Sequence, residues 1–281
     1  MSVEKLEQLR GMLRSFGSCL LAYSGGVDSV FLAFVARDVL ADKALAVIAD
    51  SPSLPRRELA EALELAERFQ IAVRVVRTRE FDNPDYLANA PNRCYFCKHE
   101  LFAELEPIAR QEGFAVIAYG ENASDAGDVR PGAQAAREFQ IRAPLKEVGL
   151  SKVEIRELSA RLGLPTAGKP QMACLSSRIP SGEPVTPEKL AMVERAENLL
   201  RDFGFHDVRV RHHEMSAGAA AGRSSSGPVR CLARIEVGLS ELPRLLETGP
   251  RELLTGELKK LGYTHVTVDL EGYRRGIMQP G

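Results

Sequence analysis

A short turn near the start of the chain has the residue types of a phosphate-binding loop. It consists of Ser24, Gly25, Gly26, Val27, Asp28 and Ser29. An apolar run precedes it and a helical pattern follows it, so the turn joins a strand to a helix. The two glycines allow backbone angles that side chains forbid. The N–H groups, the serine hydroxyls and the positive end of the helix then surround an anion. The alternative is a plain helix start, capped by Asp28 or Ser29 after a glycine turn.

The turn differs from the Walker phosphate loop because it lacks the Gly-Lys-Ser/Thr ending. It resembles the PP-loop of the ATP pyrophosphatase superfamily, whose members release pyrophosphate while they form an adenylated intermediate. The resemblance implies that the six residues bind ATP with Mg²⁺ and that Asp28 is a catalytic residue.

A second polar segment directly follows the strand pattern at 114–119. It begins at Gly120 and reaches Asp125. A carboxylate at the carboxyl end of a strand, facing a triphosphate site, suits magnesium coordination. A polar turn capped by Asp125 explains the same residues equally well. Gly120 and Asp125 are therefore candidate cofactor-binding residues.

Lys146 precedes a clearly marked helix start. Ser151 and Glu154 have the spacing of a capping box, so a helix is expected to begin there. Lys146 can place a point charge on phosphate oxygens and stabilise the negative charge that develops in a transition state. A solvated surface lysine is the alternative interpretation.

The segment 169–180 places a cysteine between basic residues. Cys174 lies between Lys169 and Arg178, and neighbouring positive charge favours the thiolate form of a cysteine. A thiolate can attack an adenylated carboxyl group as a nucleophile. Cys174 is therefore a candidate catalytic residue.

Four segments together resemble the LarE family of ATP-dependent sulfur transferases, over essentially the whole chain. They are the PP-loop turn, the segment 169–180, the Arg-Cys-Tyr-Phe-Cys-Lys run at 93–98 and the Ala-Arg-Ile-Glu-Val run at 233–237. The resemblance implies that the substrate is pyridinium-3,5-biscarboxylic acid mononucleotide, a precursor of the nickel-pincer nucleotide cofactor used in lactate racemase maturation. In that family ATP adenylates a substrate carboxylate, pyrophosphate leaves, and sulfur replaces AMP to give a thiocarboxylate. Two successive rounds supply the two thiocarboxylates.

The resemblance leaves two sources of sulfur open. In sacrificial members the active cysteine, here Cys174, loses its sulfur and ends as dehydroalanine. Family members with three such cysteines hold a 4Fe–4S cluster with one iron free of protein ligand, and this chain adds the pair Cys94 and Cys97. Thiolates select iron–sulfur clusters and zinc. The candidate metal ligands are thus Cys94, Cys97 and Cys174, with a zinc site or plain thiols as the alternatives.

The resemblance also assigns residues around the substrate phosphate and the active cysteine. They are Ser177, Arg178, Glu197, Arg209 and Arg211. Ser177 and Arg178 are assigned to catalysis, and the other three to cofactor binding. Arg209 and Arg211 share one face of a strand because their spacing is two, so they can grip a phosphate. The solvated face of a half-buried strand is the alternative.

The order of elements predicts an α/β fold. Strand patterns at 44–50, 71–78 and 114–119 alternate with helical patterns at 55–69 and 98–111. A loop is expected at 121–137. Alternation of this kind implies a doubly wound parallel sheet with ligands at the carboxyl ends of its strands.

The second part of the chain predicts a smaller α+β domain of the split βαβ kind. A helix at 186–203 with Thr186 as N-cap leads to a strand at 208–211. A loop at 217–227, two strands at 232–237 and 265–270, and a helical stretch at 239–261 complete it. Proline and glycine cluster before this domain, which divides the chain into 1–180 and 184–281. We expect the smaller domain to serve substrate binding and oligomerisation.

Bulk composition narrows the class of protein. The 281 residues carry a formal charge of -1, which disfavours a tRNA-sized partner. No run is apolar enough to span a membrane, and the charged, helical start is unlike a signal peptide. We therefore expect a cytoplasmic protein whose five cysteines are not structural disulfides.

The resemblance implies a homo-oligomer, a hexamer built from trimers. Three other functions stay open. Two are PP-loop enzymes, a tRNA thiolase and an amidotransferase-type synthetase, and the third is a non-catalytic ATP-binding protein.

Overall fold

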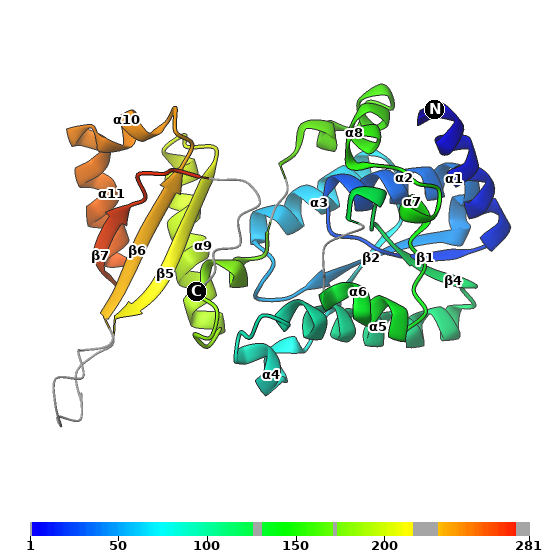
Figure 1. The fold of residues 1–281 in the computed structure, drawn as a ribbon, viewed down its shortest axis with the longest axis horizontal. Coiled ribbons are helices and arrows are strands. Elements are labelled where there is room, and N and C mark those ends of the chain that lie inside the picture. Colours follow the sequence, from blue (N-terminus) through cyan, green and yellow to red (C-terminus); the bar gives the residue numbers. More distant parts are fainter. Residues whose placement is uncertain (1, 126–130, 171–172, 216–229, 274–281) are drawn as a thin grey trace. The chain divides into compact units, whose positions relative to one another are not determined.

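The computed structural model describes residues 2–125, 131–170, 173–215 and 230–273. The chain forms two compact units (Figure 1). The first unit contains Met1–Tyr86 and Pro91–Met172, and the second contains Leu87–Ala90 and Ala173–Gly281.

A four-stranded parallel sheet forms the centre of the first unit, as the sequence predicted. Its strands are β1 (Cys19–Ala22), β2 (Ala44–Asp50), β3 (Val73–Arg77) and β4 (Val116–Tyr119). Their order is β3-β2-β1-β4, with β1 paired to both β2 and β4. Because the strands are parallel, all their carboxyl ends lie at one edge of the sheet, where the turn after β1 and the segment after β4 begin.

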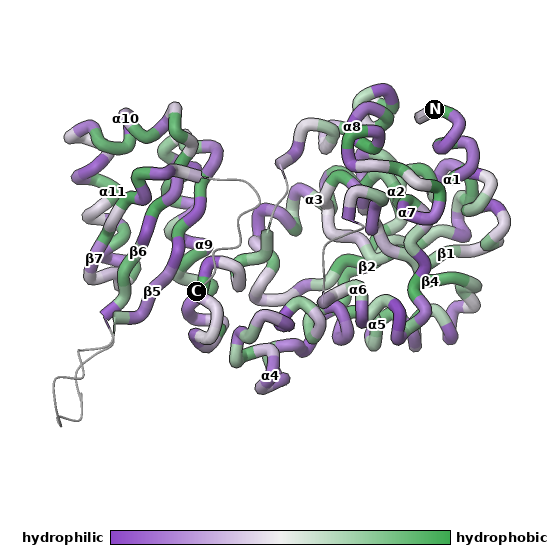
Figure 2. The backbone as a smooth tube through the Cα atoms, in the orientation of Figure 1, coloured by the Kyte–Doolittle hydropathy of each residue, from purple (hydrophilic) through white to green (hydrophobic). Residues whose placement is uncertain are grey.

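Helices cover both faces of this sheet (Figure 1). One face packs against α1 (Ser2–Phe16), α2 (Val27–Leu40), α3 (Arg56–Arg68) and α8 (Lys152–Arg161), and the other against α5 (Arg93–Glu112) and α6 (Pro131–Glu138). Consecutive residues of β1 divide between the two cores, since Leu21 belongs to one and Leu20 to the other. The first unit is therefore doubly wound. The strands β1 and β2 are apolar along most of their length (Figure 2).

Two local predictions in the first unit were wrong. The segment 121–137, expected as a loop, contains α6, because Pro131 suits a first helical position and Ala135 and Ala136 bury against the core shared with α5. The helix α5 begins at Arg93 and not near 98, so Cys94 and Cys97 lie in its first turns. Shorter helices in this part of the chain are α4 (Pro84–Leu87) and α7 (Pro144–Glu147).

The second unit contains a mixed three-stranded sheet. Its strands are β5 (Val208–Met215), β6 (Arg230–Val237) and β7 (Tyr263–Val268), in the order β5-β6-β7. β5 and β6 are antiparallel, and β6 and β7 are parallel. The helices α9 (Pro187–Asp202), α10 (Leu242–Leu246) and α11 (Thr248–Lys260) cover one face. Side chains that alternate with the core residues, among them Arg209, Arg211, Arg234 and Glu236, lie on the opposite face, which we call the arginine face.

The small domain differs from the prediction in two respects. β6 and β7 are neighbours, so the βαβ unit is contiguous and not split. The predicted helix at 239–261 is two helices, because Pro250 has no N–H to continue the ladder from α10 into α11. The predicted N-cap is confirmed, since the hydroxyl of Thr186 accepts the Lys189 N–H at 3.3 Å. The predicted loop at 217–227 lies outside the described residues.

In the described parts of the chain, no helix has the length and apolar character needed to cross a membrane.

Candidate functional site

The turn between β1 and α2 requires glycine for two physical reasons. Gly25 has φ +69, a conformation that side chains rarely adopt. A Cβ atom at Gly25 would also lie 2.6 Å from the Cβ of Ala62 on α3. The turn therefore packs directly against α3, and no larger residue fits at this position.

Among the described residues, no side chain caps the N-terminus of α2. Its N-cap residue is Gly26, and neither Asp28 nor Ser29 caps it. The hydroxyl oxygen of Ser29 instead accepts the Ser24 N–H at 3.1 Å and donates to the Gly26 carbonyl at 3.1 Å, which fixes the turn internally. The N–H groups of the first helical turn are left for an anion. The capped-helix alternative is thus not what the structure shows.

The segment after β4 closes against this turn. A Cβ atom at Gly120 would lie 2.9 Å from the backbone nitrogen of Ser29, so glycine lets the two segments meet. The side-chain amide of Asn122 donates to Oδ2 of Asp28 at 3.4 Å. The carboxylate of Asp125 accepts the Asn122 N–H at 3.2 Å and so helps to close its own turn.

Asp28 forms the central ion pair of the site. The ammonium of Lys152 lies 2.6 Å from Oδ2 of Asp28. Oδ1 of Asp28 is buried and has no hydrogen-bond partner among the described residues. One oxygen of this carboxylate is therefore paired with the ammonium of Lys152, and the other is available to bind a ligand or a metal ion.

Lys152 and Asn122 are site residues that sequence reasoning missed. Lys152 is the first residue of α8, whose capping box is confirmed: Ser151 accepts the Glu154 N–H, and Glu154 accepts the Ser151 N–H at 2.9 Å. A lysine in a first helical turn opposes the helix dipole. That unfavourable position sets Lys152 apart in the sequence, although it does not identify Asp28 as its partner.

Lys146 lies in a separate network. Its ammonium is 2.8 Å from Oε1 of Glu121, and the hydroxyl of Tyr119 donates to the other oxygen of Glu121. Burial and then the hydrogen bond to Glu121 raise the pKa of Tyr119 above its ordinary value. In this structure the lysine paired with the PP-loop aspartate is Lys152 and not Lys146.

The donor set fits a magnesium ion that arrives with a nucleotide. The described residues contain no group of three or more His, Cys, Asp or Glu side chains placed to hold a metal. Nucleotide-bound Mg²⁺ typically takes only one or two protein carboxylates, with phosphate oxygens and waters completing the shell. The buried Oδ1 of Asp28, which has no hydrogen-bond partner in the described part of the chain, is an acceptor of that kind.

In the second unit, Cys174 begins a 3-10 turn, η5 (Leu175–Arg178), and is exposed. Its carbonyl oxygen accepts hydrogen bonds from the backbone and the hydroxyl of Ser177, at 3.0 and 2.7 Å. The guanidinium of Arg178 also donates to this carbonyl, at 3.1 Å, and to that of Ala173, at 2.7 Å. Hydrogen bonds from Ser177 and Arg178 thus fix the backbone of Cys174, while the cysteine itself is exposed to solvent.

A buried ion pair anchors this turn. Arg178 is 2% exposed and Glu197 is 0% exposed, and Nε of Arg178 lies 2.8 Å from Oε1 of Glu197. Glu197 also accepts from Arg201 at 3.0 Å and from the Val210 N–H at 3.1 Å. Burial opposes ionisation of Glu197, but the charge and hydrogen bond of Arg178 hold its pKa below the ordinary value. The pair therefore fixes the turn of Cys174, and the catalytic role expected for Arg178 stays a prediction.

The two strand arginines have different surroundings. Arg211 binds both oxygens of Glu236, at 2.8 and 3.3 Å, and donates to the Ser177 carbonyl at 2.7 Å. It therefore links the strand to the turn of Cys174. The guanidinium of Arg209 lies over the ring of Tyr273, 4.7 Å from its centroid.

Cys94 and Cys97 lie three residues apart on α5, in the first unit, whereas Cys174 belongs to the second. The ammonium of Lys98 lies 5.7 Å from the ring centroids of both Phe102 and Tyr119. Burial lowers the pKa of Lys98, and the charges of Cys97 and Cys94 oppose that change. The three-cysteine cluster stays a prediction.

Lys169, the second basic residue expected to favour a Cys174 thiolate, has its own partners. Its ammonium lies 2.6 Å from Glu58 and 3.2 Å from Glu61, both on α3. Lys169 therefore forms its ion pairs within the first unit.

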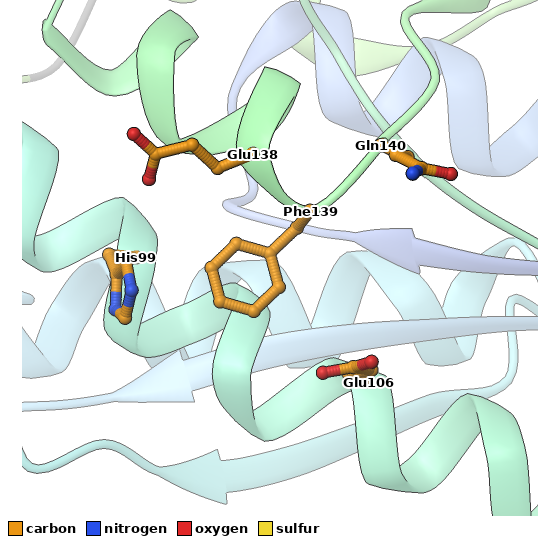
Figure 3. Close-up of a pocket in the computed structure, with 5 residues that line it drawn as sticks. All are labelled: His99, Glu106, Glu138, Phe139 and Gln140. Carbon is orange, nitrogen blue, oxygen red and sulfur yellow. The ribbon is translucent and has the colours of Figure 1, made fainter.

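A hollow on the surface of α5 and α6 involves none of the predicted site residues (Figure 3). It is lined by His99, Glu106, Glu138, Phe139 and Gln140. The ring of Phe139 lies beside His99, with centroids 4.9 Å apart. Glu138 is already bound by the Tyr95 hydroxyl at 2.7 Å and by Gln134 at 2.9 Å.

Two relatives resemble the chain along nearly its whole length, and a family model matches its first part. The family model described as NAD synthase matches residues 5–88, which include the PP-loop turn. Uncharacterized protein slr1717 of Synechocystis sp. is 43% identical over 97% of this chain and 96% of its own. Pyridinium-3,5-bisthiocarboxylic acid mononucleotide synthase of Lactiplantibacillus plantarum is 32% identical over 98% of this chain and 93% of its own.

Proposed function

The chain belongs to the NAD synthase-like PP-loop ATP pyrophosphatase family that contains these relatives, and on that premise we propose that it is an ATP-dependent sulfur transferase. Its proposed substrate is pyridinium-3,5-biscarboxylic acid mononucleotide, whose carboxylates become thiocarboxylates. The name of the Lactiplantibacillus relative describes the corresponding product. The product would serve nickel-pincer nucleotide cofactor biosynthesis.

One observation carries the ATP-dependent half of the proposal. The uncapped start of α2, the glycine turn and the Asp28–Lys152 pair lie together at the carboxyl edge of the sheet. Helix N–H groups and a lysine stabilise phosphate, and the free carboxylate oxygen accepts the metal ion of a nucleotide. These groups are the ones needed to bind a triphosphate and release pyrophosphate.

In the first step a carboxylate oxygen of the substrate attacks the α-phosphorus of ATP. The bond from that phosphorus to the bridging oxygen breaks, and pyrophosphate leaves with the electron pair. The N–H groups at the start of α2 and the ammonium of Lys152 stabilise the charge on the leaving group. Bound Mg²⁺ would neutralise part of that charge, and Oδ1 of Asp28 would coordinate the metal ion.

In the second step Cys174 acts on the adenylated carboxyl group. Its thiolate attacks the carbonyl carbon, AMP leaves, and a thioester forms. In the sacrificial route a base then removes the α-proton of Cys174, and the Cβ–Sγ bond breaks to give dehydroalanine and the thiocarboxylate. Arg178 and Ser177 hold the backbone of Cys174 during these steps.

The second source of sulfur is a 4Fe–4S cluster, which Cys94, Cys97 and Cys174 would hold. Thiolates are the donors such clusters take, so the residue types fit. The cluster would supply a sulfur that can be replaced, and the protein would then act repeatedly.

The experiment is to incubate the protein with ATP, Mg²⁺ and the mononucleotide and to measure pyrophosphate and AMP. Release of both only when substrate is present supports the proposal. Thiolation of tRNA or amide formation with ammonia would identify one of the other PP-loop enzymes. Tight ATP binding without pyrophosphate release would identify a non-catalytic ATP-binding protein.

A further inference from the structure

Arg209 is a buried arginine that forms no ion pair with a carboxylate of the described residues. It is 7% exposed and lies on the arginine face of the small sheet, opposite Glu236. Both oxygens of Glu236 are bound by Arg211, and Arg234 lies 3.4 Å from one of them. Across the described part of the chain, the contact found for the Arg209 guanidinium is the ring of Tyr273.

This arrangement is unfavourable unless an anion is supplied from outside. Removing a charge from water is costly when no partner compensates it. Burial, and then the charges of Arg178 and Arg211, lower the pKa of Arg209, and the charges of Tyr273 and Glu236 partly oppose that change. On the arginine face, Arg211 and Arg234 form ion pairs with carboxylates, whereas Arg209 has no direct carboxylate partner among the described residues.

The backbone after β7 places the ring of Tyr273 against Arg209. The Asp269 N–H donates to Ile235 at 2.9 Å, and the Tyr273 N–H donates to Val237 at 2.7 Å, so the segment runs along β6. Between them Gly272 has φ +66, and a Cβ atom there would lie 2.9 Å from the Val237 carbonyl oxygen. The turn that delivers Tyr273 is thus fixed by hydrogen bonds and by glycine.

The contact has a geometry suited to orienting the guanidinium. Its central carbon lies 4.7 Å from the ring centroid, which is within cation–π distance. The five N–H donors of a guanidinium lie in its own plane. A ring that covers one face of the group leaves its in-plane donors available to a phosphate.

We propose that Tyr273 is a positioning residue of the substrate site, whose ring holds Arg209 so that its N–H groups bind the phosphate monoester of a mononucleotide. The identity of the mononucleotide rests on the proposed function. The positioning role is independent of the sulfur chemistry. Arg211, which binds Glu236 and Ser177, supports the turn of Cys174.

The test uses the absence of tryptophan from the chain. Tyr273→Trp introduces a single tryptophan at the position whose ring lies over Arg209. The probe is nicotinic acid mononucleotide, titrated without ATP, and its nucleoside, nicotinic acid riboside, is the matched ligand without phosphate. The mononucleotide is expected to change the tryptophan emission saturably, and the nucleoside is not. Adding Arg209→Met to this variant should abolish the response.

Calorimetric measurement of mononucleotide affinity separates the contribution of the Tyr273 ring from that of its hydroxyl. Tyr273→Phe should bind the mononucleotide within about twofold of the original protein, and Tyr273→Leu about tenfold more weakly. Affinity for ATP, which binds at the PP-loop, should be unchanged in both.

Equal mononucleotide affinity in Tyr273→Leu and the original protein would overturn the proposal. So would a loss of ATP affinity that matches the loss of mononucleotide affinity, because it would show a general structural defect. No outcome depends on sulfur transfer, so failure of this proposal can be distinguished from failure of the proposed function.

Discussion

The ammonium of Lys152 lies 2.6 Å from the carboxylate of Asp28, although 124 positions separate the two residues in the chain. The pair joins the first turns of α2 and α8 and places a lysine beside the uncapped start of α2. Asp28 keeps its second carboxylate oxygen buried and without a partner among the described residues.

The first prediction concerns this lysine. Lys152→Met should lower substrate-dependent pyrophosphate release by about 10²–10³-fold, because a charge that stabilises the leaving group is lost. Asp28→Ala should abolish the release. Lys146→Met is the matched control, since Lys146 pairs with Glu121 and not with Asp28. A larger effect of Lys146→Met than of Lys152→Met, measured as pyrophosphate per enzyme, would reverse the assignment of the two lysines.

The second prediction concerns the anchor of the Cys174 turn. Arg178→Leu should lower the free energy of unfolding by about 3–5 kcal/mol, because it leaves Glu197 buried without its main partner. Adding Glu197→Leu should restore part of that loss, and urea denaturation measures both. In the double variant Cys174 should react faster with a thiol reagent, since its carbonyl loses the Arg178 hydrogen bond. Unchanged stability in Arg178→Leu would contradict the role of the pair.

Short-range features of the site were predictable from sequence, and its long-range contacts were not. The strand, glycine turn and helix around Asp28 follow from local pattern, and so do the caps at Ser151 and Thr186. The partner of Asp28 depends on how α8 packs beside α2, which no local pattern encodes. Lys146 was therefore preferred for the phosphate role, while Lys152 pairs with Asp28.

Helix boundaries were less predictable where short alanine-rich or proline-containing segments occur. α6 has only eight residues, and its helical form depends on packing of Ala135 and Ala136 against the core beside α5. The break between α10 and α11 follows from Pro250, whose effect was hidden by the apolar periodicity around it.

The third prediction concerns pH and His212, which is buried in β5 with both ring nitrogens unpartnered among the described residues. Burial, and then the charge of Lys189, lower the pKa of His212 from 6.5 to about 4. The unfolded chain therefore binds this proton at higher pH than the folded chain. Stability is fully present above about pH 6.5 and falls as the pH drops toward 4.

Between about pH 7 and pH 4.5 this residue alone should cost about 2 kcal/mol of unfolding free energy. His212→Gln should show a correspondingly smaller loss over the same interval. His265→Gln, at an exposed position of β7, is the control and should behave as the original protein. Identical pH dependence of His212→Gln and the original protein in urea denaturation would remove His212 as the cause.

The fourth prediction separates the two sources of sulfur. If Cys94, Cys97 and Cys174 hold a cluster, protein isolated without oxygen should contain about four irons. Cys94→Ala and Cys97→Ala should then lose iron and repeated turnover. If Cys174 is sacrificial, iron-free protein should transfer one sulfur and lose the mass of hydrogen sulfide. That mass loss, with full activity in both variants, would exclude the cluster as the source.

The most direct test of the central claim is a mass spectrum of the mononucleotide after anaerobic incubation with the protein, ATP and Mg²⁺. The account predicts that a carboxylate oxygen of the mononucleotide is replaced by sulfur, with AMP and pyrophosphate formed in equal amounts. Cys174→Ala should release pyrophosphate and form the adenylated mononucleotide but no thiocarboxylate. Formation of ADP and orthophosphate by the original protein, or an undiminished yield of thiocarboxylate from Cys174→Ala, would contradict it.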